Sequence, residues 1–140
     1  MLVDTGGLVL RVVVHPADVT DRDGAQQVLA AIPAEFPIVT QIWVDAGYRG
    51  RLVAWAKETL DLTLIVVHRP RRWVRVPDDQ EPPPAPVGFA VLPRRWVVER
   101  TFAWLGRYRR LSKDYEQLAA TEESWIFVAM TQLMTRRLAQ

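Results

Sequence analysis

The chain has 140 residues, of which 49% are hydrophobic and 24% charged, and this balance is typical of a single soluble globular domain. It has no cysteine and only two histidines, which excludes disulfides and thiolate metal sites and argues against a zinc site built from histidines. No apolar run approaches the roughly 18 to 20 residues of a membrane span, and residues 1–7 lack the features of a signal peptide. We therefore expect a cytoplasmic protein without membrane partners, in which carboxylates would hold any metal.

The positive charges are clustered, although the formal net charge is only +2. Arginine makes up 16 of the 18 basic residues, and most of these arginines lie between positions 69 and 110. A cluster of this kind can face phosphates. A genome rich in G and C also raises the arginine content, so composition alone leaves nucleic-acid binding open.

The N-terminal residues predict a β-hairpin followed by a helix. Residues 1–3 and 8–14 are apolar runs, and they flank the turn-forming residues 4–7. Residues 21–32 carry apolar side chains at helical spacing, and Pro33 closes this segment.

A strand, a helix and a second strand are predicted next. Residues 38–44 have the β-branched content of a buried strand, residues 52–60 have a helical pattern, and residues 62–67 form another apolar run. This order predicts a parallel strand pair joined by a right-handed crossover.

The rest of the chain predicts a long loop and two helices within one domain, 1–140. Residues 70–93 hold seven of the ten prolines, so we expect an irregular loop at about 69–94. Helical periodicity then runs from Arg95 to about Tyr108, and a last helix is expected over 121–138.

Two acidic residues occupy positions that suit a metal site. Asp45 follows a predicted strand, and Gly47 and Gly50 leave the backbone room to turn and to admit a ligand. Capping of the next helix or an Asx turn is the alternative role for Asp45. Glu99 has bulky apolar neighbours, so we expect it to point toward the protein; the alternative is an exposed acid paired with Arg95.

Carboxylates from a strand end and from a distant helix can converge on one divalent ion. Mg²⁺ prefers oxygen ligands and keeps waters or substrate phosphates in the rest of its shell. Two such ions about 3.5 to 4 Å apart can activate an attacking hydroxyl and stabilise the leaving oxygen in nucleic-acid cleavage. Asp45 and Glu99 are therefore candidate catalytic and metal-binding residues.

Three motifs in order resemble those of DDE transposases of the insertion-sequence five type. Residues 2–25, with Leu2-Val3-Asp4-Thr5-Gly6-Gly7-Leu8, resemble the strand hairpin and helix entry of that family. Residues 45–50, Asp-Ala-Gly-Tyr-Arg-Gly, resemble its second-aspartate motif. Residues 94–105 resemble its glutamate motif, and the similarity continues to Glu116.

The resemblance implies an α/β fold, a partial ribonuclease H-like fold with a mixed β-sheet and flanking helices. Asp45 would be the second metal ligand and Glu99 the third. The first aspartate belongs, in the family, to a strand upstream of the hairpin, so we expect this chain to be a C-terminal part that lacks the first catalytic strand. Asp4 matches a hairpin residue outside the catalytic set.

DNA contacts are also implied by the resemblance. Arg95 and Arg107 match basic positions that the family places around the glutamate, near one helical face, and phosphate contact is their expected role. We add the neighbouring arginines and one tryptophan of the predicted loop, which could stack on a base: Arg100, Arg109, Arg110 and Trp73. The other tryptophans are expected mostly in the core.

The expected function is metal-dependent DNA strand cleavage and strand transfer during transposition, with a two-ion Mg²⁺ or Mn²⁺ site in the intact enzyme. The isolated chain is expected to be inactive, because catalytic groups that act as a unit fail together. Its expected partners are transposon ends, target DNA, and another copy or an intact transposase, in the bacterial nucleoid. The alternative is a non-catalytic remnant that binds DNA or an intact transposase and inhibits it.

Overall fold

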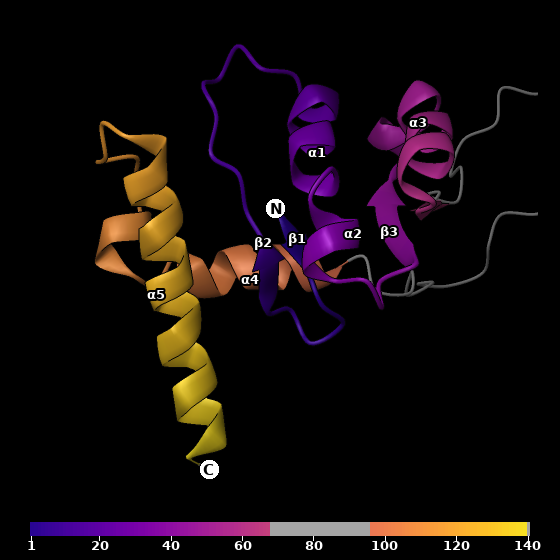
Figure 1. The fold of residues 1–140 in the computed structure, drawn as a ribbon. Helices are drawn as coiled ribbons and strands as arrows, with labels where there is room; N and C mark the ends of the chain where they lie inside the picture. Colours follow the sequence, from indigo (N-terminus) through magenta and orange to yellow (C-terminus); the bar gives the residue numbers. More distant parts are fainter. Residues whose placement is uncertain (68–95, 140) are drawn as a thin grey trace, which may run out of the picture.

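The computed structural model describes residues 1–67 and 96–139, and these form helices around two small sheets (Figure 1). The predicted loop at about 69–94 lies outside the described residues, as do Trp73 and Arg95. Among the described residues, no helix has both the length and the apolar character needed to cross a membrane.

The predicted hairpin is confirmed. Strands β1 (Leu2–Val3) and β2 (Val9–Arg11) pair antiparallel. Asp4 closes the turn, because its Oδ1 accepts hydrogen bonds from the backbone N–H groups of Gly6 and Leu8, both at 2.8 Å. Asp4 is therefore a turn residue, as its sequence setting predicted.

The parallel pair is confirmed as well. Strands β3 (Gln41–Asp45) and β4 (Thr63–Val67) lie parallel in continuous register, from Gln41 beside Thr63 to Asp45 beside Val67. Helix α3 (Arg51–Leu60) connects them and buries Leu52 and Ala56. Asp61 ends this helix in a left-handed conformation, which turns the chain into β4.

The predicted helix 21–32 is divided in two. Helix α1 (Asp21–Leu29) begins after Thr20, whose side chain accepts from the Asp23 N–H, and a short helix α2 (Ile32–Glu35) follows. Pro33 lies in the first turn of α2, where a missing N–H costs no hydrogen bond. Proline therefore starts a helical turn here, although we expected it only to end one.

The expected single mixed sheet is not found among the described residues. The hairpin and the parallel pair are two separate two-stranded sheets. They belong to different hydrophobic clusters: the parallel pair packs with α1, α2 and α3 around Ile32, Ile42 and Leu62, while the hairpin packs with two later helices around Val12 and Met130. Leu2 of β1 also contacts the first cluster.

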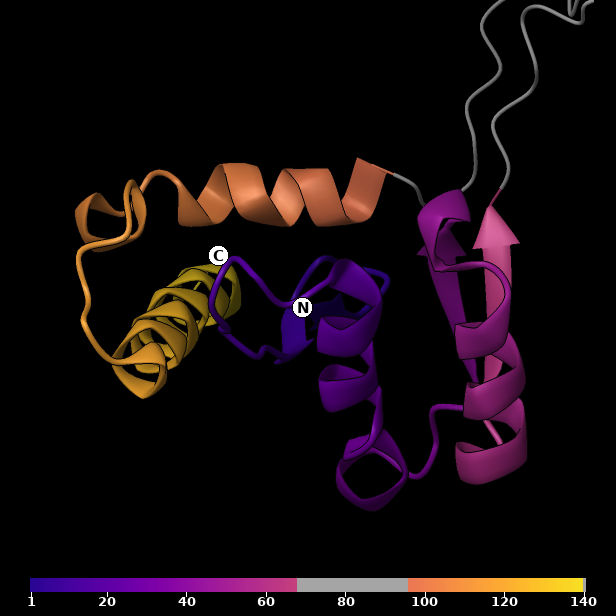
Figure 2. The same ribbon diagram turned by 90° about the horizontal axis from the view of Figure 1, so that it is seen from above.

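Those later helices are α4 (Trp96–Leu105) and α5 (Ala119–Leu138). Helix α4 crosses the molecule, and the second half of α5 extends beyond the rest of the fold (Figures 1 and 2). We expected α4 to continue to Tyr108, but it ends before Gly106, and α5 begins two residues earlier than predicted. Leu118 precedes α5 and provides no side-chain cap.

The turn of the hairpin holds α4 directly. Thr101 is completely buried, and its Oγ1 donates to the carbonyl of Gly7 at 2.7 Å. Arg100 Nη2 donates to the carbonyl of Gly6 at 2.8 Å. Gly7 has φ +84°, and a Cβ there would lie 2.9 Å from Thr101 Oγ1 and 3.0 Å from the Trp104 ring. Only glycine therefore fits this close approach without strain.

Gly7→Ala should destabilise the protein by about 2–4 kcal/mol, because it adds left-handed backbone strain to a steric clash with α4. Gly47→Ala is the matched control, since nothing lies within 4 Å of a Cβ at that position. Urea unfolding followed by circular dichroism measures both. A Gly7→Ala variant as stable as the control would mean that the turn and α4 are not in contact.

Thr101→Val should cost about 1–2 kcal/mol in the free energy of unfolding, because it leaves the buried carbonyl of Gly7 without a donor. Thr135→Val is the control. The hydroxyls of Thr101 and Thr135 each donate to the carbonyl four residues earlier, at 3.0 and 2.8 Å, but Thr135 is exposed and, among the described residues, has no partner comparable to Gly7. The same urea measurement compares the two, and equal losses would show that the Thr101 bond to Gly7 contributes nothing.

Candidate functional site

Asp45 is the last residue of β3, as predicted, and it is exposed. A short 3₁₀ turn, η1 (Ala46–Tyr48), follows it, and the Asp45 side chain makes no capping hydrogen bond to that turn. The Asp45 side chain therefore does not cap η1, and the N-cap of α3 is Gly50. The carboxylate stands at the end of a parallel strand, where α/β proteins commonly bind ligands.

The turn after Asp45 is held against the start of α1. Arg22 Nε donates to the carbonyl of Gly47 at 3.1 Å. Burial raises the pKa of Tyr48, and the negative charges of Asp21 and Asp45 raise it further. The Tyr48 phenol therefore stays neutral and lies close enough to both carboxylates to feel their charge. These contacts hold the backbone of the turn that directly follows Asp45.

Glu99 lies in the first turn of α4 and is exposed, which corrects the expectation that it points toward the protein. The buried face of α4 consists of Val97, Thr101 and Leu105 at four-residue spacing. A position two residues from both Val97 and Thr101 lies on the opposite side of the helix, because each residue turns it by about 100°. The apolar neighbours in sequence therefore do not surround Glu99.

The start of α4 is directed toward the half of the molecule that holds β3 and β4 (Figures 1 and 2). The helix spans from this half to the hairpin and α5, so its first turn is the part nearest the parallel strands. Glu99 is thus on the end of α4 that faces the half containing Asp45. Within 1–67 and 96–139, no group of three or more His, Cys, Asp or Glu side chains forms a metal cluster.

Arg100, which we predicted to bind DNA, makes contacts within the protein. Its guanidinium lies 4.3 Å from the ring centre of Trp96 and 4.8 Å from that of Trp104, and Arg137 of α5 lies 4.5 Å from the same Trp104 ring. Together with the bond to Gly6, these cation–π contacts tie α4 to the hairpin turn and to α5. Trp96 is 51% exposed, so it is not a core residue.

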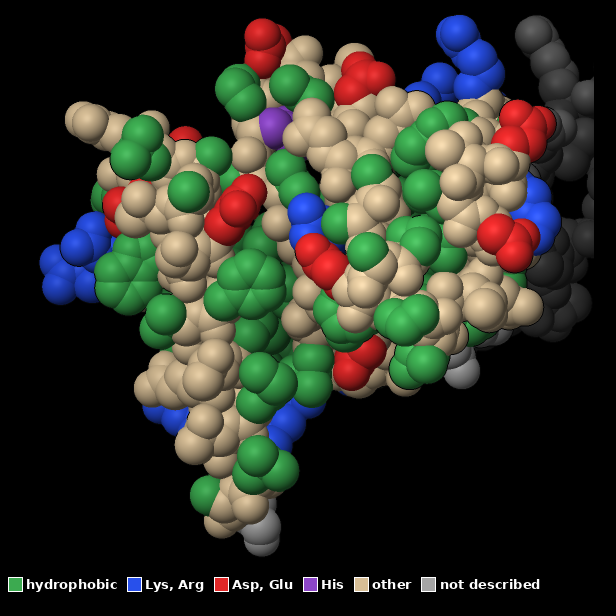
Figure 3. Space-filling model, viewed as in Figure 1, with side chains coloured by type: hydrophobic (Ala, Val, Ile, Leu, Met, Phe, Trp, Pro, Cys, Tyr) green, Lys and Arg blue, Asp and Glu red, His purple; other side chains and the backbone are tan. Residues whose placement is uncertain are grey.

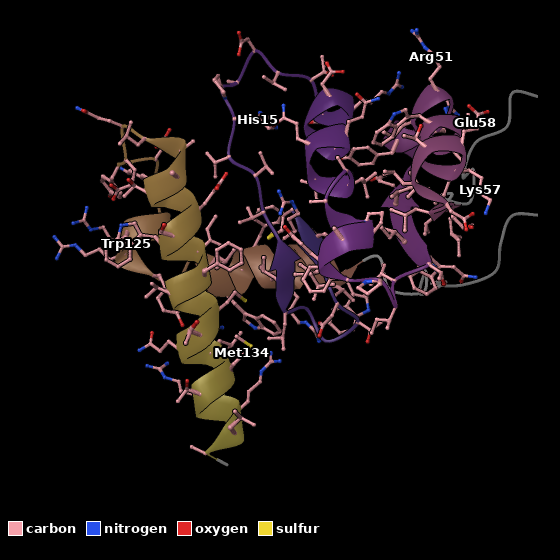
Figure 4. All side chains as sticks on the ribbon, viewed as in Figure 1. His15, Arg51, Lys57, Glu58, Trp125 and Met134 are labelled. Atoms are coloured by element: carbon pink, nitrogen blue, oxygen red, sulfur yellow. The ribbon has the colours of Figure 1, made fainter. Side chains whose placement is uncertain are left out.

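The remaining predicted DNA-binding arginines lie after α4. Arg107 is exposed in the turn beyond the end of α4. The expectation that it shares a helical face with Glu99 was therefore wrong. Arg109 and Arg110 are exposed in the short turn η2 (Arg109–Leu111). Arg110 pairs with Glu116 at 3.0 Å and lies over the Trp125 ring, which Figure 4 shows on the outer side of α5.

Sequence reasoning missed the residues that hold α4 in place. From the sequence, we treated Thr101 and Gly7 only as parts of motifs and assigned no role to Arg137. A signal existed for the turn, because two consecutive glycines often allow a close backbone approach. No local signal paired that turn with a threonine 94 positions away.

A family model described as the transposase DDE domain matches residues 1–134. The chain belongs to this family. No significant match is found among curated proteins or among solved structures.

The general activity of the domain follows from its family. The family implies DNA binding and DNA cleavage in transposition, and its members generally use divalent metal ions. The exposed carboxylates of Asp45 and Glu99 fit such an ion in donor type, because Mg²⁺ and Mn²⁺ prefer oxygen ligands.

Removing one of the exposed arginines after α4 should weaken DNA binding, because each substitution removes a salt-sensitive contact with a phosphate. For Arg107→Ala and Arg109→Ala, we expect the slope of log K against log salt to become shallower by about 1 each. Arg51→Ala is the control, because Figure 4 shows Arg51 at the outer end of α3, on the opposite side of the molecule from α5. Fluorescence anisotropy with a DNA duplex over a salt series measures this.

An equal change of slope in all three variants would contradict a localised DNA-binding surface.

Arg100→Ala should lower the free energy of unfolding, because it removes two ring contacts and the bond to Gly6.

Proposed function

We propose that this transposase domain supplies two of the metal-binding carboxylates, Asp45 and Glu99, for DNA strand cleavage and strand transfer by a transposase of the insertion-sequence five type. The observation that carries the proposal is the family match together with the placement of one acid at a strand end and the other at the facing end of α4. The finer assignment to a ribonuclease H-like fold is part of the same proposal.

Each residue would have a limited task. A bound divalent ion would polarise the phosphate and activate the attacking hydroxyl. Asp45 and Glu99 would hold it, and the braced turn at Gly47 would keep the Asp45 carboxylate oriented. Arg107 and Arg109 would bind the phosphates of the transposon end or target.

Two carboxylates are fewer than the three that the family resemblance implies. We therefore expect the chain on its own to bind metal weakly and to leave DNA uncut, with cleavage requiring a third carboxylate from another polypeptide segment. The inactivity of the isolated chain and its location in the bacterial nucleoid are parts of the same proposal.

Asp45→Asn and Glu99→Gln should each lower Mn²⁺ affinity by at least about tenfold, because each removes a charged oxygen ligand. Isothermal titration calorimetry with Mn²⁺ measures this, and urea unfolding checks that the variants remain folded. Glu58→Gln is the control, since Figure 4 shows Glu58 on the outer side of α3.

The outcomes separate the proposal from its alternative. If neither substitution changes Mn²⁺ binding while salt-sensitive DNA binding persists, the chain acts as a non-catalytic DNA-binding remnant. If only one substitution matters, the two acids do not share an ion.

A further inference from the structure

A cavity of about 530 Å³ lies beside β2, between α5 and the segment formed by α1 and α2. Its walls include Glu35 of α2 together with Glu123 and Phe127 of α5. Figure 3 shows this face of the molecule, where acidic and basic side chains gather around the hollow between α5 and the body of the protein. A volume of this size lies within the range of about 300–1,000 Å³ that is usual for ligand pockets.

The floor of the cavity is formed by the end of β2 and the residues that follow it. Leu10 and Arg11 of β2 line the cavity, as do the next two residues, Val12 and Val13. Side chains of a strand alternate between its two faces, so Leu10 and Arg11, which are neighbours in β2, border one cavity only along the edge of the strand. Within the described parts of the chain, β2 pairs with β1 alone. Its other edge therefore offers backbone N–H and C=O groups to a further strand.

The open stretch of this edge has a defined end. Strand β2 ends at Arg11, and the backbone N–H of Val14, three residues further on, donates to Glu123 Oε1 at 2.8 Å, so this N–H is not available to an added strand. The available edge is thus short, and it suits an extended segment of a few residues.

The charges that line the cavity favour a positively charged segment. Glu35 forms an ion pair with Arg11, and Glu123 is held by Val14, each through its Oε1 atom. These two carboxylates and one guanidinium leave a net negative charge, which attracts a cation and repels DNA phosphates. Phe127, 42% exposed, adds an apolar wall.

We propose that this cavity binds an extended polypeptide segment, which adds to the edge of β2 as a third strand and places a Lys or Arg side chain between Glu35 and Glu123. Backbone hydrogen bonds to residues 10–13 would supply affinity, and the carboxylates and Phe127 would supply selectivity. The partner is a protein with a short β-prone basic segment. This inference does not depend on the proposed metal site.

The probe is the peptide acetyl-Thr-Val-Arg-Val-Thr-amide, added to the full ¹⁵N-labelled chain and followed by amide chemical shifts. We expect saturable shifts at residues 10–13 and in the turn of α5 around Phe127. Replacing the Arg of the peptide by Glu should weaken binding by about fivefold or more. N-methylation of its alternate amides should abolish binding, because it removes the strand hydrogen bonds.

Phe127→Ala tests the apolar wall, and Val128→Ala is its matched control, because Val128 is also exposed on α5 but does not line this cavity. Only Phe127→Ala should weaken the peptide, with an otherwise preserved spectrum showing that the fold is intact. The proposal is overturned if no saturable shifts appear at millimolar peptide, if they centre elsewhere, or if the N-methylated peptide binds equally well. Shifts that depend on protein concentration without peptide would instead assign the edge to a second copy.

Discussion

The candidate site depends on the docking of α4 on the turn between β1 and β2. Thr101 donates to Gly7 from a fully buried position, and Arg100 donates to Gly6 while lying between two tryptophan rings. These bonds set the direction of α4. Because Glu99 is in the first turn of the same helix, its position relative to β3 follows from a contact that involves neither carboxylate.

The arginines of the second half divide into two groups with different tasks. Arg100 and Arg137 stack on tryptophan rings and hold α4, α5 and the hairpin together. Arg107 and Arg109 are exposed and make no ion pair within the described residues, so their charge is available to a phosphate.

The sequence was most informative where local patterns determine structure. Turn residues predicted the hairpin, and two apolar runs around a helical segment predicted the parallel pair with Asp45 at a strand end. It was least informative about packing between distant segments. The apolar neighbours of Glu99 suggested that it is buried, but the face of α4 that packs against the rest of the protein contains Val97 and Thr101. Likewise, no local pattern showed that the two strand pairs would remain separate sheets or that Arg100 would lie between rings. Asp45 and Glu99 were chosen as partners from the motif, and their shared ion stays a prediction.

The long separation between Thr101 and Gly7 also bears on the order in which the protein assembles. Strands β3 and β4 are close in sequence, so their pairing with α3 closes only a short loop and can form early. The bond between α4 and the hairpin closes a loop of 94 residues, which costs more chain entropy, so we expect it to form later. During synthesis, Asp45 can reach its native surroundings first, because Glu99 is held in place only after α4 has been made and has docked.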